Sequence, residues 1–361
     1  MRPRLLILCQ TQFGYHTDTY FYCKFLRGHF ETTYLCWDYN REKQYLKNVD
    51  VIYVSRSGSI ISRNIRYIFA CINHLRKNNY DSGLIKYFRG CSILRMFCPG
   101  RDWIFDIRTG AVEKNAISRG FYNTLMRIEA SVFPNVTIVS KSLAKKLFLL
   151  GKSEIVPLGA ESIANNSKEF GSLKLLYVGT LANRNIEDTV NGFAKFYRQC
   201  QSKLRVSYTI IGSGHKEEEA KLRELVDKLD LNDVVNVLGY VAHAGLQPYF
   251  SDCNVGMSYV PITAYFDSQP VTKTFEYLLS GMPVIATATS ENANVIDDEN
   301  GVLIEDSLDG VYQGLREIWA RRNTFSSPEI IQASQEYRWK NIVKALGEHV
   351  ASIINNSNSS N

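Results

Sequence analysis

Long apolar runs and cysteines at paired spacing are both missing from this sequence of 361 residues. No stretch approaches the roughly 18 consecutive apolar residues of a transmembrane helix, so we predict no membrane span. The apolar run at residues 5–9, behind Arg2 and Arg4, is too short for a secretory segment, so we expect no signal peptide. The eight cysteines show no CxxC spacing, which favours reduced, buried thiols in a cytoplasmic protein over disulfides or a zinc site.

Charge is unevenly distributed along the chain. Residues 1–155 contain 24 Lys and Arg against 11 Asp and Glu, and the remaining residues contain 18 against 25. The two parts therefore carry net charges of +13 and −7, which indicates two units with different partners. A basic first half suits anionic lipid headgroups, a pyrophosphate-bearing acceptor or nucleic acid. No RNA-binding aromatic motif or recognition-helix pattern is present, so we expect no nucleic-acid partner.

Short apolar runs alternate with segments of helical periodicity. Residues 5–8 and 206–211 are typical of buried strands, whereas residues 61–77 place Ile, Phe and Leu at helical spacing. Strands separated by helices predict a parallel sheet covered on both faces. The alternation stops near Pro157, and residues 160–172 are polar and rich in Asn, Ser and Gly.

The alternation restarts at Leu173, so we predict an α/β chain of two doubly wound Rossmann-like domains that face an interdomain cleft. The domains are expected over residues 1–158 and 173–335, with a hinge at 159–172. Apolar residues recur every three or four positions from Trp339 to Ile353, which predicts a final helix over 336–354 that packs back toward the first domain. The Asn and Ser segment 355–361 should be disordered.

Glycines follow three of the predicted strands, at Gly14, Gly179 and Gly212 with Gly214. Such glycines let the backbone approach a phosphate, and the alternative is that they only make tight turns. The Gly212 turn is not a dinucleotide fingerprint, because it has no third glycine and carboxylates at 217–219 would repel a pyrophosphate. A nicotinamide enzyme is therefore disfavoured.

Two segments of the second half carry phosphate-binding chemistry. Arg184, five residues past Gly179, can donate two hydrogen bonds to a phosphate, and the alternative is a solvated loop arginine. A loop containing Pro270 runs into a short helix whose first-turn N–H groups are open to a phosphate. Lys273 adds positive charge there, and Glu276 can accept hydrogen bonds from vicinal hydroxyls such as a ribose diol.

Ordered motifs between residues 173 and 305 resemble the nucleotide-binding half of the retaining family-4 glycosyltransferases, which have the GT-B fold. The matching segments are 177–181, 210–214, 237–241, 274–286 and 299–304, with a weaker match at 155–159. The resemblance implies that Glu276 binds the ribose and Arg184 the diphosphate. It implies further that backbone at Val271 and Thr272 cradles phosphate or donor sugar, and that a segment with Tyr240 and Val241 lines the base.

Two positions depart from the family pattern. Ser268 stands where the first of two glutamates contacts the donor sugar, and Thr180 stands where an arginine follows the glycine. Lys273 can supply the missing cation, as in the subset of the family with a lysine three residues before the glutamate.

The first half offers three candidate catalytic residues, each with a structural alternative. His16 follows the first predicted strand, and Asp106 and Arg108 end another. The resemblance places a polar, sugar-contacting residue near Asp106 and Arg108, and an Asp–Arg ion pair with a purely structural role fits equally. A loop histidine such as His16 can also be incidental.

The sequence as a whole predicts a glycosyltransferase of hexosyltransferase type. We expect a nucleotide diphosphate sugar as donor, UDP before GDP, and a glycan or lipid-linked acceptor in cell-surface polysaccharide biosynthesis. We see no metal-binding triad and expect no metal or other cofactor, with the leaving diphosphate stabilised by Arg184, Lys273 and backbone N–H groups. A sugar-nucleotide epimerase of similar fold and a non-catalytic nucleotide-sugar-binding scaffold subunit are the alternatives.

Basic side chains on two predicted helices raise the question of a membrane partner. Arg63, Arg66, Arg76 and Lys77 oppose the apolar stripe of residues 61–77, and lysines recur at positions 141, 145 and 146. They form either solvated helix faces or a patch that holds the enzyme at the anionic cytoplasmic face of a membrane.

Overall fold

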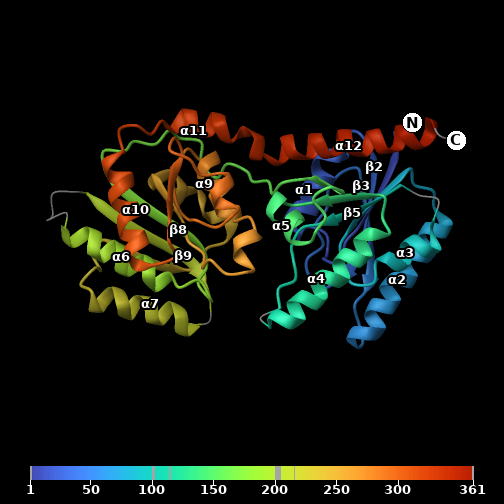
Figure 1. Ribbon diagram of the computed structural model, residues 1–361, viewed down its shortest axis with the longest axis horizontal. Coiled ribbons are helices and arrows are strands. Elements are labelled where there is room, and N and C mark those ends of the chain that lie inside the picture. Colours follow the sequence, from blue (N-terminus) through green and yellow to red (C-terminus); the bar gives the residue numbers. More distant parts are fainter. Residues whose placement is uncertain (1, 100–101, 114, 200–204, 215, 360–361) are drawn as a thin grey trace. The chain divides into compact units, whose positions relative to one another are not determined.

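The chain forms two compact units in a computed structural model that describes residues 2–99, 102–113, 115–199, 205–214 and 216–359 (Figure 1). Unit 1 takes the chain as far as Leu158 and includes the segment from Trp339 onward, and unit 2 comprises Gly159–Arg338. Each unit is a parallel sheet with helices on both faces, which confirms the prediction of two α/β domains with Rossmann-like topology.

Unit 1 is built on seven parallel strands in the order β3-β2-β1-β4-β5-β6-β7. Its elements are β1 (Arg4–Leu8), α1 (Thr17–Leu26), β2 (Glu31–Asp38), β3 (Val49–Ser55), α2 (Ile60–Lys77), β4 (Ser82–Lys86), α3 (Ser92–Phe97), β5 (Asp102–Ile107), α4 (Ala116–Ser131), β6 (Asn135–Ile138), α5 (Lys141–Lys146), β7 (Ser153–Ile155) and α12 (Trp339–Ser359). Strands buried on both faces read as continuous apolar runs, which is why β1 is Leu and Ile almost throughout.

Two apolar clusters lie on the two faces of this sheet. One contains side chains of α1 and α12, including Tyr22 and Trp339, and the other contains side chains of α2 to α5, including Tyr67 and Met126. Six of the seven described cysteines belong to these two clusters, and Cys253 belongs to the core of unit 2; all seven are free and buried. Cys200 lies outside the described residues.

Helix α12 belongs to unit 1 although it is the last segment of the chain. Trp339 stacks on Phe21 of α1 with ring centroids 5.3 Å apart, and the apolar stripe continues to Ile353 and Ile354. We expected the chain to be disordered from residue 355, and this was wrong as far as Ser359, where the helix ends. Once packing on α1 has stabilised the helix, each further turn adds hydrogen bonds without a new nucleation cost.

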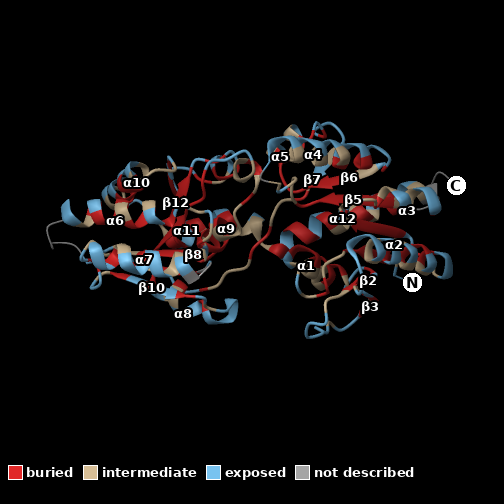
Figure 2. Cartoon of the chain, turned by 90° about the horizontal axis from the view of Figure 1, so that it is seen from below, coloured by how far each residue is buried: buried red, intermediate tan, exposed pale blue. Residues whose placement is uncertain are grey.

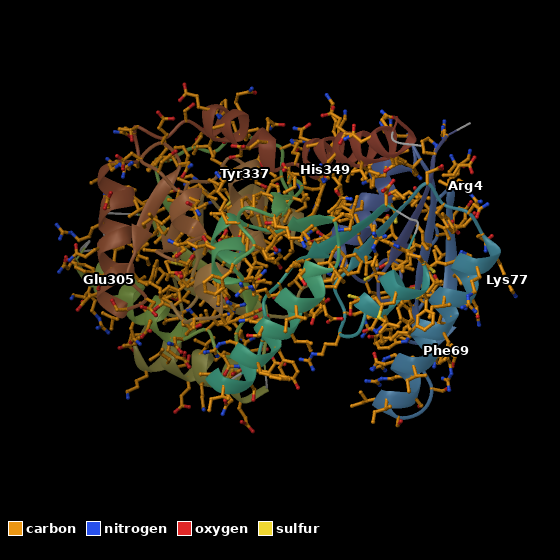
Figure 3. All side chains as sticks on the ribbon, turned by 45° about the vertical axis from the view of Figure 1, so that its right-hand side comes forward. Arg4, Phe69, Lys77, Glu305, Tyr337 and His349 are labelled. Carbon is orange, nitrogen blue, oxygen red and sulfur yellow. The ribbon has the colours of Figure 1, made fainter. Side chains whose placement is uncertain are left out.

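Helix α2 buries less of its apolar stripe than its spacing predicts. Its buried side chains begin at Tyr67, whereas Ile61, Ile65 and Phe69 are 72, 49 and 60% exposed. Phe69 and Lys77 lie on this helix in Figure 3, and much of its surface is coloured as exposed in Figure 2. The buried positions of α2 are Tyr67, Cys71, Ile72 and Leu75. The helical spacing of apolar residues over 61–77 therefore did not reveal which of them the sheet covers.

Unit 2 has six parallel strands in the order β10-β9-β8-β11-β12-β13. Its elements are β8 (Leu173–Thr180), α6 (Ile186–Gln199), β9 (Val206–Ser213), α7 (Lys216–Lys228), β10 (Val235–Gly239), η1 (His243–Gly245), α8 (Gln247–Asp252), β11 (Val255–Ser258), η2 (Phe266–Ser268), α9 (Thr272–Leu279), β12 (Val284–Thr287), η3 (Asn292–Asn294), β13 (Gly301–Ile304), α10 (Leu308–Ala320), α11 (Ser327–Ala333) and η4 (Ser334–Tyr337). The strand order reverses between β8 and β11, and ligands of such sheets bind at the carboxyl ends of the strands beside that point.

Candidate functional site

A hollow of about 270 Å³ opens at the carboxyl ends of β8 and β11, where the strand order of unit 2 reverses. Its lining includes six of the residues that the sequence assigns to the donor: Gly179, Thr180, Arg184, Val271, Thr272 and Lys273. These residues come from the end of β8 with the β8–α6 loop that follows it, and from the start of α9, so the fold brings together two segments that are far apart in the sequence.

Arg184 is a half-buried cation beside the aromatic wall of this hollow. Its guanidinium lies 4.1 Å from the ring centroid of Phe266, an attractive cation–π arrangement. Asn183 and Asn185 on either side have positive φ angles of 56° and 52°, which asparagine tolerates better than most residues. Among the described residues, no carboxylate lies within 4.0 Å of the Arg184 side chain. Burial lowers the pKa of Arg184, but an arginine starts so high that its charge is kept.

The first turn of α9 faces the same hollow. Its N-cap, Val271, provides no side-chain hydrogen bond, and no acidic residue lies in the first turn. Thr274 fixes the turn, because its hydroxyl lies 2.6 Å from the Ser258 hydroxyl of β11 and donates to Asn292. The open N–H groups of such a turn, together with the helix dipole, favour an anion.

Glu276 lies one turn further along α9 and is buried, with 6% of its surface exposed. One carboxylate oxygen accepts a hydrogen bond from Lys273, and the other lies 3.5 Å from Nε2 of His243. His243 was not predicted. It belongs to η1, two residues beyond Val241 in the segment that the resemblance assigned to the base. This position was the signal in the sequence that could have marked His243 as a site residue.

The other predicted donor residues lie outside this hollow. Tyr240 is 74% exposed at the end of β10, Val241 packs on the core of unit 2, and Ser268 is buried in η2. Gly212 pairs with Gly179 across β8 and β9, where an added Cβ would lie 2.1 Å from the Gly179 carbonyl oxygen. Gly212 is therefore required by strand packing. Gly14 lies in unit 1 with a φ of 87°, in a turn that few other residues adopt.

Arg108 is at the centre of a buried ion pair and hydrogen-bond network within unit 1. It is 5% exposed and lies 2.5 Å from the Asp18 carboxylate, and it donates to the carbonyl oxygens of Val156 and Pro157. Asp106 is fully buried 3.9 Å from Arg108 and accepts a hydrogen bond from Thr137. Burial raises the pKa of Asp106 to about 6, against the opposing charge of Arg108. These contacts are those of the structural ion pair, and a catalytic role for either residue stays a prediction.

His16 is the N-cap of α1. Its Nδ1 accepts a hydrogen bond from the backbone N–H of Thr19 at 3.4 Å. Burial, with the charge of Lys86 as the next cause, lowers the pKa of His16 to about 4. The imidazole is therefore neutral at neutral pH, and contact with a sugar stays a prediction.

Two structural features are absent from the residues that the structure describes. These residues contain no group of three or more His, Cys, Asp or Glu side chains placed to hold a metal ion. They also contain no helix that is both long and apolar enough to cross a membrane.

Comparison with known proteins gives a family match for the second unit and a fold match for the whole chain. Residues 172–321 match the family "Glycosyl transferases group 1". No match was found among curated protein sequences. Sucrose-phosphate synthase from Thermosynechococcus elongatus has a similar structure, with a TM-score of 0.75, 15% identity, and coverage of 98% of this chain and 99% of that chain.

Two structures of HepE from Anabaena are also similar. The complex with UDP has a TM-score of 0.74 and 13% identity, and the complex with UDP-glucose has a TM-score of 0.70 and 12% identity. Each comparison covers 97% of this chain and 100% of that chain. Residues 172–321 thus resemble group 1 glycosyltransferases in sequence, and the chain as a whole has the fold of GT-B glycosyltransferases.

Proposed function

We propose that this chain is a glycosyltransferase that takes a sugar from a UDP-sugar bound in unit 2. The observation that carries the proposal is the hollow at the ends of β8 and β11, which joins Arg184, Lys273 and the open first turn of α9. Two cations and free N–H groups complement a diphosphate. The family match supports the reaction class, and the similarly folded HepE, solved with UDP and with UDP-glucose, supports uridine as the base.

The geometry suggests how each group acts. The bond between the anomeric carbon and the diphosphate oxygen breaks, the anomeric carbon bonds to the oxygen of an acceptor hydroxyl, and the proton of that hydroxyl passes to the departing diphosphate or to water. Negative charge then develops on the diphosphate, where Arg184, Lys273 and α9 stabilise it. Glu276 would accept hydrogen bonds from the ribose hydroxyls, exchanging its present contacts with Lys273 and His243 for them.

The finer points of the proposal come from the family resemblance. They are retention of the anomeric configuration, catalysis without a metal ion, and a glycan or lipid-linked acceptor in cell-surface polysaccharide synthesis. The NMR coupling constant of the anomeric proton in the product tests retention. Turnover in the presence and absence of EDTA tests catalysis without a metal ion.

The decisive experiment is a ligand panel followed by turnover. Thermal unfolding is recorded with UDP, GDP, ADP and NAD, and UDP release is then measured with a set of UDP-sugars and candidate acceptors. We expect UDP to stabilise the protein most. Stabilisation by UDP without any transfer would favour the scaffold alternative, interconversion of the free UDP-sugar would favour an epimerase, and preference for NAD would refute the proposal.

We also propose that unit 1 rests on an anionic membrane surface. Ile61, Ile65 and Phe69 are exposed on α2, and residues 1–155 carry a net charge of +13. Exposed apolar side chains beside basic ones suit the headgroup region of a bilayer. Sedimentation with phosphatidylglycerol vesicles at low salt tests this, and Phe69→Asp should release the protein from the vesicles.

A further inference from the structure

A second hollow, of about 370 Å³, lies at the carboxyl ends of β2 and β3 in unit 1. It is lined by polar and aromatic side chains of those strand ends and of the segments that follow them: Asp38, Tyr39, Asn40, Tyr53, Ser55, Arg56 and Ser57. Arg66 of α2 donates to the carbonyl and hydroxyl oxygens of Ser57, which holds the segment after β3 in place. The hollow is thus formed by well-anchored backbone.

Arginine side chains stack on aromatic rings around this hollow. The Arg56 guanidinium lies 4.3 Å from the ring centroid of Tyr39 and 5.7 Å from that of Trp37. Arg63 of α2 lies 5.6 Å from the Trp37 ring, and Arg41 lies 5.5 Å from the Tyr39 ring. Stacking of this kind fixes a guanidinium in one plane while its N–H edge stays free to bind a ligand.

Three buried polar atoms in this cluster have no hydrogen-bond partner among the described residues. They are Nε1 of Trp37, Nε of Arg56 and Nε of Arg63, and the Trp37 side chain is 95% buried, with 5% exposed. All three are N–H donors, and indole and guanidinium groups have no acceptor atoms. A buried donor without an acceptor is unfavourable and rare in folded proteins, so the group that completes this cluster must supply acceptors.

Nearby carboxylates do not supply the missing charge. Asp38 is the acidic residue of the lining, and it already lies 3.5 Å from Lys43 and accepts a hydrogen bond from the backbone N–H of Asn40. No described carboxylate lies within 4.0 Å of Arg56 or Arg63. The cluster therefore has an excess of positive charge together with its unused donors.

We propose that the Trp37, Tyr39, Arg56 and Arg63 cluster binds a phosphate-bearing group. An acceptor-only anion matches both the unused N–H groups and the unpaired charge, and arginine donates to phosphate through two parallel hydrogen bonds. If the chain is a glycosyltransferase as proposed above, this phosphate belongs to the acceptor, and the enzyme glycosylates a phosphorylated molecule. The phosphate belongs either to a soluble acceptor or to a lipid headgroup.

Binding is measured on the full chain with two probes. Inorganic pyrophosphate is titrated by calorimetry into the Arg184→Gln protein, in which the proposed donor site is weakened. Vesicles of phosphatidylcholine with phosphatidic acid are compared with vesicles of phosphatidylcholine alone. Arg56→Gln and Arg63→Gln are the test variants, and Arg198→Gln, at the exposed end of α6 in unit 2, is the control.

We expect Arg56→Gln and Arg63→Gln to weaken binding of one probe at least tenfold, with Arg198→Gln unchanged. Loss of pyrophosphate binding identifies a soluble phosphate, and loss of vesicle binding alone identifies a lipid headgroup. Trp37→Phe, which keeps an aromatic ring at this position but removes the N–H group, should weaken binding of the same probe. Equal binding of the probes by all variants overturns the inference. So does a failure of both probes to bind when the wild-type protein still binds UDP, and neither result bears on the donor site.

Discussion

The two candidate functional arginines, Arg108 and Arg184, differ in their hydrogen-bond and ion-pair partners. Arg108 is surrounded by acceptors and acts as an internal tie, whereas Arg184 lies in a hollow with an aromatic ring as its neighbour and no carboxylate among the described residues within 4.0 Å. Both were candidate functional arginines on sequence alone. The Arg108 guanidinium is held inside unit 1 by the Asp18 carboxylate and two carbonyl oxygens, whereas Arg184 lines a hollow that can admit a ligand.

Arg184→Gln should weaken UDP binding by about 10- to 100-fold, because a hydrogen bond to a charged group contributes roughly 1.5–3 kcal/mol. Isothermal titration with UDP and with uridine measures the effect, and uridine affinity should hardly change. Arg198→Gln, at the exposed end of α6, is the control. Equal loss for UDP and uridine would show that Arg184 does not act on the diphosphate.

His16 should make folding sensitive to acid. Burial lowers its pKa from 6.5 to about 4, so below pH 6.5 the unfolded chain takes up a proton that folded His16 does not. Stability that is present above pH 6.5 is then lost as the pH falls toward 4. His16→Asn keeps an N-cap acceptor but does not titrate. We expect the wild type to lose roughly 2 kcal/mol more than this variant between pH 7 and 4, after allowance for partial exposure.

Urea unfolding of both proteins at a series of pH values tests the role of His16. The raised pKa of Asp106 acts in the opposite sense, because the folded state protonates first, but it is common to both proteins and cancels in the difference. Parallel profiles would mean that His16 is not buried in solution.

At the scale of elements, close helix contacts decide where a side chain is tolerated. An added Cβ at Gly192 of α6 would lie 2.7 Å from Cβ of Val311 and 2.8 Å from the Leu308 carbonyl oxygen of α10. Gly120 of α4 has no heavy atom within 4 Å of the same position. The two glycines look alike in the sequence and differ only in what lies across from them.

Gly192→Ala should destabilise the protein by about 1–3 kcal/mol, because α6 and α10 must separate to admit the methyl group. Gly120→Ala should instead stabilise it by about 0.5–1 kcal/mol, because alanine restricts the unfolded chain and favours the helix. Equilibrium urea unfolding measures both free energies. The same sign for both changes would contradict the packing of α6 on α10.

At the scale of the whole molecule, unit 1 is completed by the far end of the chain. Trp339 is 1% exposed and packs with Phe21 and Tyr22 of α1. Residues 159–338, which form unit 2, lie between these partners in the sequence. Unit 1 therefore closes its core only after unit 2 has been synthesised.

Trp339→Ala should destabilise unit 1 by about 3–5 kcal/mol, as expected for removal of a buried tryptophan. Hydrogen exchange should accelerate in peptides of β1 and α1 and stay unchanged in β8 to β12. Trp319→Ala, on α10 of unit 2, should give the reverse pattern. Uniform acceleration after either change would show that the two units unfold together.

The sequence by itself determined the alternation of strands and helices and the segments that carry the donor-site residues of unit 2. Strand and helix periods depend on residues close together in the chain, so the two α/β units and the elements around Arg184, Lys273 and Glu276 could be predicted. The glycines and the Pro270 loop carried the same kind of local signal.

Only the tertiary structure decided which side chains meet. Strand β4 lies next to β1 at the strand-order reversal of unit 1, and a Cβ added at its Gly83 would lie 2.3 Å from the Trp103 ring, a contact that the spacing of residues 82–86 does not reveal. The approach of His243 to Glu276, the partners of Arg108 and the exposed residues of α2 likewise depend on sheet order and on what each helix covers. Such contacts join residues far apart in the chain, and no local spacing encodes them.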